Sequence, residues 1–434
     1  MSELSPISQS FVDQHSAAEF TSTLPWLDQL RAEGLDSFSM LGLPTPRIEA
    51  WKYTNLNVLE KLDVARPLES VSIDAASLAW LPEEMATHKL VFVNGSYEAG
   101  LSDIGDLTAG VKIMSLAEAM GKEPALLEAH LGKIASVETA PVLALNTAFI
   151  EDGYVVVVEN VQLDKPIEVI FANQGAAAHH PRNLIVAKDN ARATILERHV
   201  GFGDDSYLAN HGCEVLVEGG SHIRHYRLLE DSAAGINLST TNTSIGKDST
   251  YDSFILSIGG KLSRSEIHVA CEAGGAHTNL NGVYVARDSQ HVDHTTHIDH
   301  LVPNTTSKET YKGALDDKAR GVFQGAIVVA KGADGTDGRM SNKTLLLSDN
   351  AEIDAKPQLE IYADDVLCAH GFTAGELDDD SLFYLRSRGI PEATARSILV
   401  EGFLAEVVEE GVAEAYRDVF ISKISEWMPK GIGA

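Results

Sequence analysis

The middle of the chain repeats a type of turn rather than a sequence, and this repeat is the strongest constraint on its fold. Asp or Gly followed by a small or polar residue recurs at Asp189, Gly219, Asp248, Gly274, Asp288, Asp317, Asp349 and Asp364. The spacings between these turns are 30, 29, 26, 14, 29, 32 and 15 residues, close to one or two units of about 15. A strand plus a turn takes about 15 residues, so two or three strands would make a rung of about 30.

Stacked rungs of this length would bury an inner file of apolar side chains, while each backbone pairs with the rungs above and below. The segments between the turns are rich in Val, Ile and Thr, which favour strands. Hairpin signals such as Asn-Gly between strands of equal length are scarce, which favours parallel pairing over a barrel. The pattern therefore predicts a mainly β protein with a parallel β-helix core, and a flattened sandwich is the alternative.

The predicted β-helix, residues 141–375, is the middle of three regions. Residues 1–140 mix helical patterns such as LPWLDQLRAEG with strand-like pieces such as HKLVFVNGSYEAG. Residues 376–434 predict a helical domain, in which LDDDSLFYLRSRG forms one helix and Pro391 opens the next. The second helix carries an apolar stripe, for which the core of this domain is a better interpretation than a docking surface: Val400, Phe403, Leu404, Val407, Val408 and Val412.

Charge and composition exclude several classes of partner. The chain has 434 residues, with 63 acidic and 34 basic side chains, and its net charge of -29 repels nucleic acids and anionic membrane surfaces. No apolar run reaches the roughly 18 residues that a membrane span needs. The first 30 residues contain Glu3, Asp13 and Glu19 but no Lys or Arg, so we expect neither a signal nor a transit peptide. Three cysteines form no disulfide framework, which predicts a cytoplasmic protein.

The stretch QHVDHTTHIDH, residues 290–300, has the composition of a metal site. In a strand, however, His291 and His297 would share one side with two aspartates, while His294 and His300 would share the other with apolar residues. Histidines on the same side would then be roughly 20 Å apart, too far to bind one ion. We therefore interpret the stretch chiefly as a polar rung of the β-helix. The alternative is a metal site in which His291 or His300 is joined by ligands from neighbouring rungs.

The cysteines divide into two groups. Cys213 and Cys271 alternate with valine and isoleucine, which predicts buried thiols. In LEIYADDVLCAHG, Cys368 and His370 lie on one side of the predicted strand with Glu360 and Tyr362, a side we expect to face outward unless a bend near Asp364 breaks the register. Cysteine sulfur and histidine nitrogen suit iron, iron-sulfur clusters or zinc, although two ligands leave a metal incomplete.

Several enzyme signatures are absent from the sequence. It has no P-loop, no complete dinucleotide-binding glycine loop and no H-E-x-x-H zinc motif. A Ser-His-Asp arrangement assembled across the fold stays open. Two further functions stay open as well: a β-helix carbohydrate lyase or hydrolase that uses carboxylates and histidines on an outer face, and a metal-binding module that uses residues 290–300.

The segment around the C-x-H pair resembles the signature of the SufB/SufD family, the scaffold proteins of the SUF iron-sulfur cluster assembly system. The resemblance is carried by residues 356–390, KPQLEIYADDVLCAHGFTAGELDDDSLFYLRSRGI, and it extends over essentially the whole chain. Further matches are QHVDHTTHIDH, the helical tail, PRIEAWKYTNL (46–56), DKPIEVIF (164–171) and GVFQGAIVVAKGADGTDGRMSNKTLLLS (321–348). CAHGFT, in place of C-x-H-E-A, is typical of the SufD branch of this family.

The resemblance implies a right-handed parallel β-helix that pairs with SufB through the core, and a C-terminal helical domain on which the ATPase SufC docks. It implies a non-catalytic scaffold, with nucleotide hydrolysis assigned to SufC, and a homodimer is conceivable when the partners are missing. Nascent clusters would form at the SufB interface, where SufB supplies a cysteine and a glutamate, His370 supplies a ligand and Cys368 is auxiliary. Reduced flavin is implied as a cofactor of the complex, although this chain has no flavin fingerprint.

Overall fold

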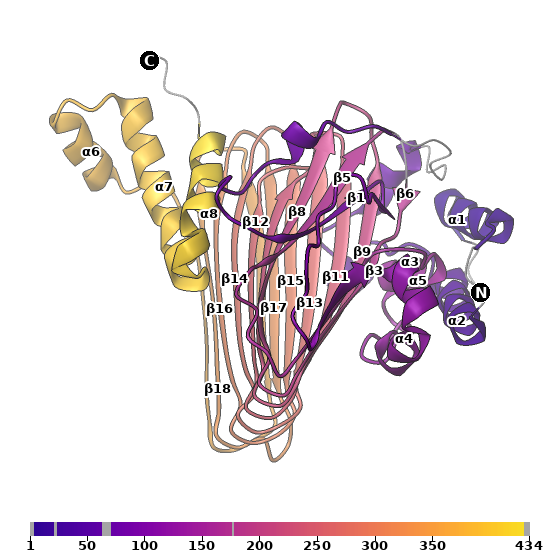
Figure 1. The fold of residues 1–434 in the computed structure, drawn as a ribbon. Helices are drawn as coiled ribbons and strands as arrows, with labels where there is room; N and C mark the ends of the chain where they lie inside the picture. Colours follow the sequence, from indigo (N-terminus) through magenta and orange to yellow (C-terminus); the bar gives the residue numbers. More distant parts are fainter. Residues whose placement is uncertain (1–3, 21–23, 63–70, 176–177, 429–434) are drawn as a thin grey trace.

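The structure is a computed structural model, and it describes residues 4–20, 24–62, 71–175 and 178–428. Two long parallel sheets face one another and are joined at both edges by short turns, so that the chain winds as a β-solenoid (Figure 1). Helices stand at both ends of the sequence, with the N-terminal helices at one end of the stack and the C-terminal helices beside the other (Figure 1). The predicted parallel β-helix is confirmed.

The two sheets alternate along the chain. Sheet A has the order β2-β1-β5-β8-β10-β12-β14-β16-β18-β20, and sheet B has the order β19-β17-β15-β13-β11-β9-β7-β4-β3, with β6 paired to β9. The strands of sheet A are β1 (His88–Val93), β2 (Ser96–Tyr97), β5 (Ile167–Gln174), β8 (Arg192–Phe202), β10 (His222–Glu230), β12 (Thr250–Ser257), β14 (His277–Ala286), β16 (Thr306–Leu315), β18 (Thr336–Leu346) and β20 (Val366–Gly375).

The strands of sheet B are β3 (Val111–Ser115), β4 (Tyr154–Glu159), β6 (Ala178–His179), β7 (Arg182–Lys188), β9 (Leu208–Val217), β11 (Ile236–Ile245), β13 (Leu262–Cys271), β15 (His291–His300), β17 (Arg320–Val329) and β19 (Glu352–Ile361). A rung therefore consists of one strand from each sheet, and it contains about 30 residues, as the turn spacing predicts. Only the pairs β1–β2 and β3–β4, at the N-terminal end of the described strands, are antiparallel.

The turns adopt the left-handed conformation that Asp, Asn and Gly tolerate. Asp189, Asp248, Asp288 and Asp317 have φ between 52° and 55°, and Gly219 has φ 61°. Turns stack on one another, because Asp248 N donates to Gly274 O and Lys318 N donates to Asp288 O. The first four turns of the series lie on one edge of the solenoid and the next three on the other, which explains the steps of 14 and 15 residues.

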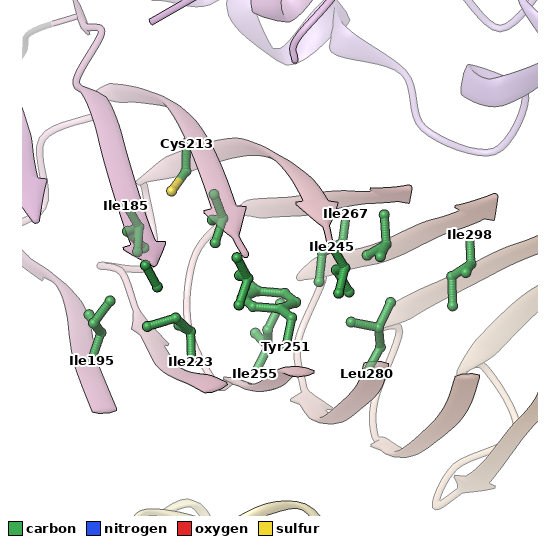
Figure 2. Packing of buried hydrophobic residues seen from close by; sticks show 14 of the residues in the cluster. Ile185, Ile195, Cys213, Ile223, Ile245, Tyr251, Ile255, Ile267, Leu280 and Ile298 are labelled. Carbon is green, nitrogen blue, oxygen red and sulfur yellow. The ribbon is translucent and has the colours of Figure 1, made fainter. Parts of the chain in front are cut away.

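The space between the sheets is filled by side chains from alternate residues of every strand. Val215, Val269, Ile298 and Ile327 occupy matching buried positions of sheet B, with Thr243 of β11 between the two valines. Isoleucines of the two sheets, such as Ile195 and Ile223 of sheet A and Ile245 and Ile267 of sheet B, face one another across the lumen (Figure 2). We call the sheet surfaces that face this space the inner faces. Cys213 and Cys271 belong to this core, and burial raises the pKa of each thiol to about 12, so their predicted burial is confirmed.

The N-terminal region packs against the first rungs and along sheet B. Its helices are α1 (Pro6–Ala17), α2 (Pro25–Leu41), α3 (Leu116–Lys122), α4 (Pro124–His130) and α5 (Pro141–Ala148), with 3-10 helices η1 (Glu49–Trp51), η2 (Leu56–Lys61) and η3 (Ala75–Leu78). Every residue of α5 is buried, and the first long strand of the core that follows it is β4. The boundary near residue 140 therefore precedes a helix rather than a strand, and the division into three domains stays a prediction.

The C-terminal helices α7 (Glu392–Gly411) and α8 (Glu414–Trp427) cover part of the outer face of sheet A, whereas α6 (Asp379–Ser387) contacts α7 and buries none of its own residues. The predicted apolar stripe is buried except for Phe403, and it packs on sheet residues such as Tyr226 and Phe254. The expected single helix from Pro391 ends earlier than the pattern suggests, because Val412 and Ala413 are extended and α8 starts a new direction. None of the helices described has the length and apolar character of a membrane span.

Candidate functional site

The last rung of the solenoid, β19 and β20, is open. Within the described residues, β20 pairs only with β18 and β19 pairs only with β17, so each strand leaves one edge of backbone donors and acceptors unpaired. Large apolar side chains are exposed on the same rung: Ile361, Tyr362, Leu367 and Phe372. Leu367, for example, is 67% exposed. Unpaired edges beside exposed apolar side chains are a template for pairing with another strand.

Cys368 lies on the inner face of this open rung. Its Sγ packs over Gly338, 3.6 Å from the position a Cβ would take there, and the side chain contacts the solenoid core. Partial burial raises the pKa of the thiol, and a hydrogen bond from the Gly338 backbone opposes that rise. Cys368 is thus the least buried of the three cysteines and the only one of them at an end of the stack.

His370 follows two residues later in β20, so its side chain leaves the strand on the same side as that of Cys368. Its register partner on β18 is Met340, a buried core residue, which identifies this side as the inner face. His370 is nevertheless exposed, because no rung covers β20. The shared side of the pair was predicted correctly, and Figure 1 places the end of the solenoid that carries it near the C-terminal helices.

The outward orientation expected for the pair was wrong. The turn at residues 362–365 separates β19 from β20 and resets the alternation of side chains. Leu359 on β19 and Cys368 on β20 therefore both contact the core, while Leu367 is the outward residue. The outward orientation was expected only if the strand continued without a bend near Asp364, and the turn at residues 362–365 breaks it there.

Three residues of the neighbouring strands, which lie beside the pair on the inner face, were not identified from the sequence. Gly338 and Met340 precede Cys368 and His370 by 30 residues each, which is one rung. Glu309 lies one strand further along the same file as Met340 and His370. Burial raises the pKa of Glu309 to about 8, although Thr296 Oγ1 donates a hydrogen bond to it at 2.6 Å. The rung period itself was the signal that would have found these neighbours.

The histidine-rich stretch forms β15, and its predicted alternation is confirmed. Val292, His294, Ile298 and His300 are buried on the inner face, whereas His297 is partly exposed on the outer face with Asp299. Hydroxyl groups engage both ring nitrogens of His300, Thr305 at 2.7 Å and Ser307 at 2.9 Å, and burial lowers its pKa to about 4.

His291 lies beneath the N-terminal region rather than beside other ligands. Its Nε2 is 3.0 Å from Thr54 Oγ1, and burial lowers its pKa. Within the described ranges, no three His, Cys, Asp or Glu side chains are arranged to hold a metal ion. His291 and His300 are thus hydrogen-bonded members of the solenoid, and Cys368 and His370 are two ligands of a site that this chain does not complete.

The segment PRIEAWKYTNL crosses the outer face of sheet B and reaches the open rung. Trp51 stacks on the Arg264 guanidinium at 3.9 Å, and Gln324 Nε2 donates to Ala50 O at 3.0 Å. Glu49 forms an ion pair with Lys356 of β19. These contacts join strands β13, β17 and β19 to one segment, which we call the N-terminal strap (residues 46–56). The strap therefore holds the last rung from outside.

Comparisons with known proteins cover the whole solenoid and the region before it. The family model described as "SUF system FeS cluster assembly, SufBD core domain" matches residues 170–403, and the model for the "SufBD protein N-terminal region" matches residues 7–169. The chain is 30% identical over 400 residues to the iron-sulfur cluster assembly protein SufD of Escherichia coli, which covers 90% of each chain.

Two further relatives agree with this assignment. A SufBD family protein of Synechocystis is 30% identical over 394 residues, 88% of this chain and 86% of the relative. SufD of Bacillus subtilis is 26% identical over 412 residues, 92% of this chain and 93% of the relative. The family models and these relatives together match nearly the full length of the chain. The chain therefore belongs to the SufBD family of the SUF system for iron-sulfur cluster assembly.

Proposed function

We propose that this protein is the SufD-type scaffold subunit of a SUF complex, which builds nascent iron-sulfur clusters on the open rung together with SufB. The observation that carries the proposal is the position of Cys368 and His370 on the inner face of an unpaired terminal strand. In this proposal the chain is not a catalyst. It supplies a surface and ligands, and SufC hydrolyses the nucleotide.

Strand pairing across the open rung supports SufB as the partner. The free edges of β19 and β20 offer backbone hydrogen bonds over 10 residues each, and Leu367 and Phe372 add apolar area beside them. Pairing of this kind gives affinity through the main chain and specificity through side chains. A related solenoid would continue both sheets and cover His370. The same edges would also allow two copies of this chain to pair when SufB is missing.

The ligand chemistry supports an iron-sulfur cluster as the cargo. A thiolate and an imidazole suit iron and its clusters. Among the described residues, Cys368 forms no disulfide and the His370 side chain is exposed to solvent. Only two such groups lie on the last rung, so the remaining ligands come from SufB in this proposal. His370 is exposed and free to turn toward a cluster, whereas Cys368 is held closer to the core.

Helix α6 supports a docking surface for SufC. It buries none of its residues, and Phe383 is 73% exposed beside an exposed Tyr384. A shallow pocket beside them is lined by Arg386, Ile390 and Pro391. The region 376–434 carries 12 acidic and 6 basic residues, so a partner with complementary basic groups would be favoured. Reduced flavin as an electron donor to the complex, and a cytoplasmic location, stay predictions.

A carbohydrate-active enzyme and a metal-binding module have less support. Family membership argues against a carbohydrate lyase or hydrolase. The two histidines singled out in residues 290–300 as metal ligands, His291 and His300, are hydrogen-bonded to Thr54, Thr305 and Ser307, which leaves a metal-binding module without free ligands at those positions.

Anaerobic reconstitution of the three-protein complex with iron and sulfide tests the proposal. We expect His370→Ala to leave the complex intact but to reduce cluster formation at least tenfold, measured by visible absorbance and bound iron. Cys368→Ala should have a smaller effect. Thr373→Ala is the matched control, since Thr373 is exposed on the other side of the same strand. Normal cluster formation by the His370 variant would refute the assignment.

A further inference from the structure

The outer face of sheet B carries two histidines side by side. His297 of β15 is the register partner of His268 on β13, the neighbouring strand (Figure 1). Adjacent strands lie about 4.8 Å apart, so side chains at matched positions of one face are next to each other. The two side chains are 36% and 43% exposed, which leaves both imidazoles accessible to an ion from solvent.

The spacing of the two rings is close to the spacing that one metal ion requires. A metal–nitrogen bond of about 2.1 Å places each ring centre about 3.2 Å from the ion, so two rings at the tetrahedral angle have centres about 5.3 Å apart. The ring centres of His268 and His297 are 5.9 Å apart, and the ring planes are tilted by 35°. Small rotations of two partly exposed side chains close a gap of about 0.6 Å.

Asp299 adds a carboxylate to the pair. Its Oδ1 lies 3.1 Å from Nε2 of His297, and neighbouring ligand atoms on one metal ion are separated by about 3.0–3.4 Å. Among the described residues, no Lys or Arg forms an ion pair with Asp299. Glu266, in contrast, is bound by Arg264, and its Oε2 is 3.9 Å from Nε2 of His268, beyond hydrogen-bond distance. Asp299 is therefore the carboxylate that is available to a cation.

A pocket of about 400 Å³ opens over these groups. His268 and Asp299 line it from sheet B, and residues 133–140 of the N-terminal region contribute further lining. Its lining includes the acidic residues Glu272 and Asp299 and the basic residue Lys133, which is exposed. The charge balance favours a cation, and the volume leaves room for water molecules that would complete its coordination shell.

We propose that His268, His297 and Asp299 bind one divalent transition-metal ion of the type of Zn²⁺ or Fe²⁺. Two imidazoles and one carboxylate, with open positions for water, are a donor set that proteins use for these ions. Within the described part of the chain the three donor atoms do not yet surround one point, because His297 and Asp299 are hydrogen-bonded to each other. Binding replaces this hydrogen bond with two bonds to the ion.

The site is separate from the open rung, because β17 lies between β15 and β19 in sheet B. It also differs from the metal site considered for residues 290–300, since its ligand from that stretch is His297 and its second histidine comes from the preceding strand of the sheet. Histidines on one side of β15 are too far apart to share an ion, whereas the stacking of rungs brings two histidines together. The proposal does not depend on where clusters are built.

Calorimetric titration of the full chain with Zn²⁺ tests the proposal. The chain is purified without a histidine tag and carries Cys368→Ser and His370→Ala, so that the open rung does not contribute ligands. We expect one Zn²⁺ to bind per chain. Crystals of this chain soaked in zinc should show an anomalous peak between the rings of His268 and His297.

His268→Ala and His297→Ala, each added to this background, should weaken zinc binding at least about tenfold, since loss of even an outer-shell partner of a metal ligand costs about 10- to 100-fold. Both side chains are partly exposed, so we expect the variants to fold, and circular dichroism verifies this.

His222→Ala is the matched control. His222 also pairs with an aspartate, Asp252 at 2.6 Å, but its register partners on the two neighbouring strands are Thr250 and Arg192 rather than a histidine. This variant should bind zinc as the background does. Equal zinc binding by all variants, or an anomalous peak at another position, would indicate an adventitious ion only and would overturn the proposal, as would the absence of any peak.

Discussion

The carboxylate of Glu49 lies 2.6 Å from Nζ of Lys356, and this ion pair joins the N-terminal strap to β19 at the open end of the solenoid. The partners are 307 residues apart in the sequence. The pair is exposed enough to contribute little stability by itself. Its interest lies in its position, because the strap is anchored at Trp51 and ends beside the rung that carries Cys368 and His370.

Trp51→Ala should release the strap. The indole is buried and stacks on Arg264, so the truncation leaves a cavity beside a buried guanidinium. We expect a loss of about 3–5 kcal/mol in the free energy of unfolding, measured by urea denaturation, and faster amide hydrogen exchange in β19. Lys52→Ala, at the exposed neighbouring position, should change neither. Unchanged exchange in β19 after Trp51→Ala would show that the strap does not hold the last rung.

Stability should fall with rising pH through the titration of Glu309. Its pKa is about 8 in the folded protein and near 4.5 when unfolded, because burial disfavours the carboxylate. Between these values the folded state holds a proton that the unfolded state has lost, so the contribution present below pH 4.5 is lost by pH 8. Over this range it amounts to something on the order of 4 kcal/mol.

Glu309→Gln should remove this pH dependence while keeping a partner for Thr296. Urea denaturation between pH 5 and pH 8 measures it, and the variant should be increasingly more stable than wild type toward pH 8. Glu352→Gln, at an exposed carboxylate on β19, serves as control. Parallel stability curves for wild type and Glu309→Gln would contradict the burial argument.

The turns of the solenoid should resist substitution where the backbone is left-handed. Gly275 has φ 79°, and an added Cβ would lie 2.2 Å from the Asp248 carboxylate of the stacked turn below. Gly275→Ala should therefore cost about 1–3 kcal/mol of unfolding free energy, measured by urea denaturation. Gly402→Ala is the contrasting variant, since Gly402 lies inside α7 with no atom near the added methyl group, and it should stabilise by about 0.5–1 kcal/mol.

The solenoid was predictable because its turns are local. Asp189, Asp248 and Asp317 mark left-handed positions that the sequence displays directly. Asn304, with φ 60°, occupies an equivalent turn that a pattern of Asp and Gly alone does not include, although Asn adopts the same conformation. The alternation of side chains along a strand then predicted correctly which residues of β15 face inward and which face outward, because no turn interrupts this strand.

The candidate site was predictable only in part, because its orientation depends on one turn and its environment on distant strands. The spacing of Cys368 and His370 put both on one side, but the turn at residues 362–365 decided which side that is. The burial of the Arg227 guanidinium inside the lumen had no local signal in the sequence. Whether a buried charge finds a partner depends on residues across the lumen such as Thr241, which periodicity does not identify.

The open rung should lose its partner when its apolar edge is charged, if the proposed pairing with SufB is correct. Leu367 is exposed on the outer side of β20, so Leu367→Asp leaves the inner ligands and the core packing intact. We expect affinity for SufB to fall about 30-fold, because a buried apolar contact in an interface is worth about 2 kcal/mol or more. Calorimetric titration with SufB measures this loss.

Leu301→Asp is the matched control for Leu367→Asp. Leu301 is also an exposed leucine, 46% accessible, but it follows β15 and lies away from the last rung. Its substitution should leave SufB binding unchanged, while both variants keep the Tm of wild type within about 2 °C, since exposed substitutions rarely alter stability. Equal SufB binding by the two variants would place the partner on another surface, and cluster ligation by His370 would then need a different explanation.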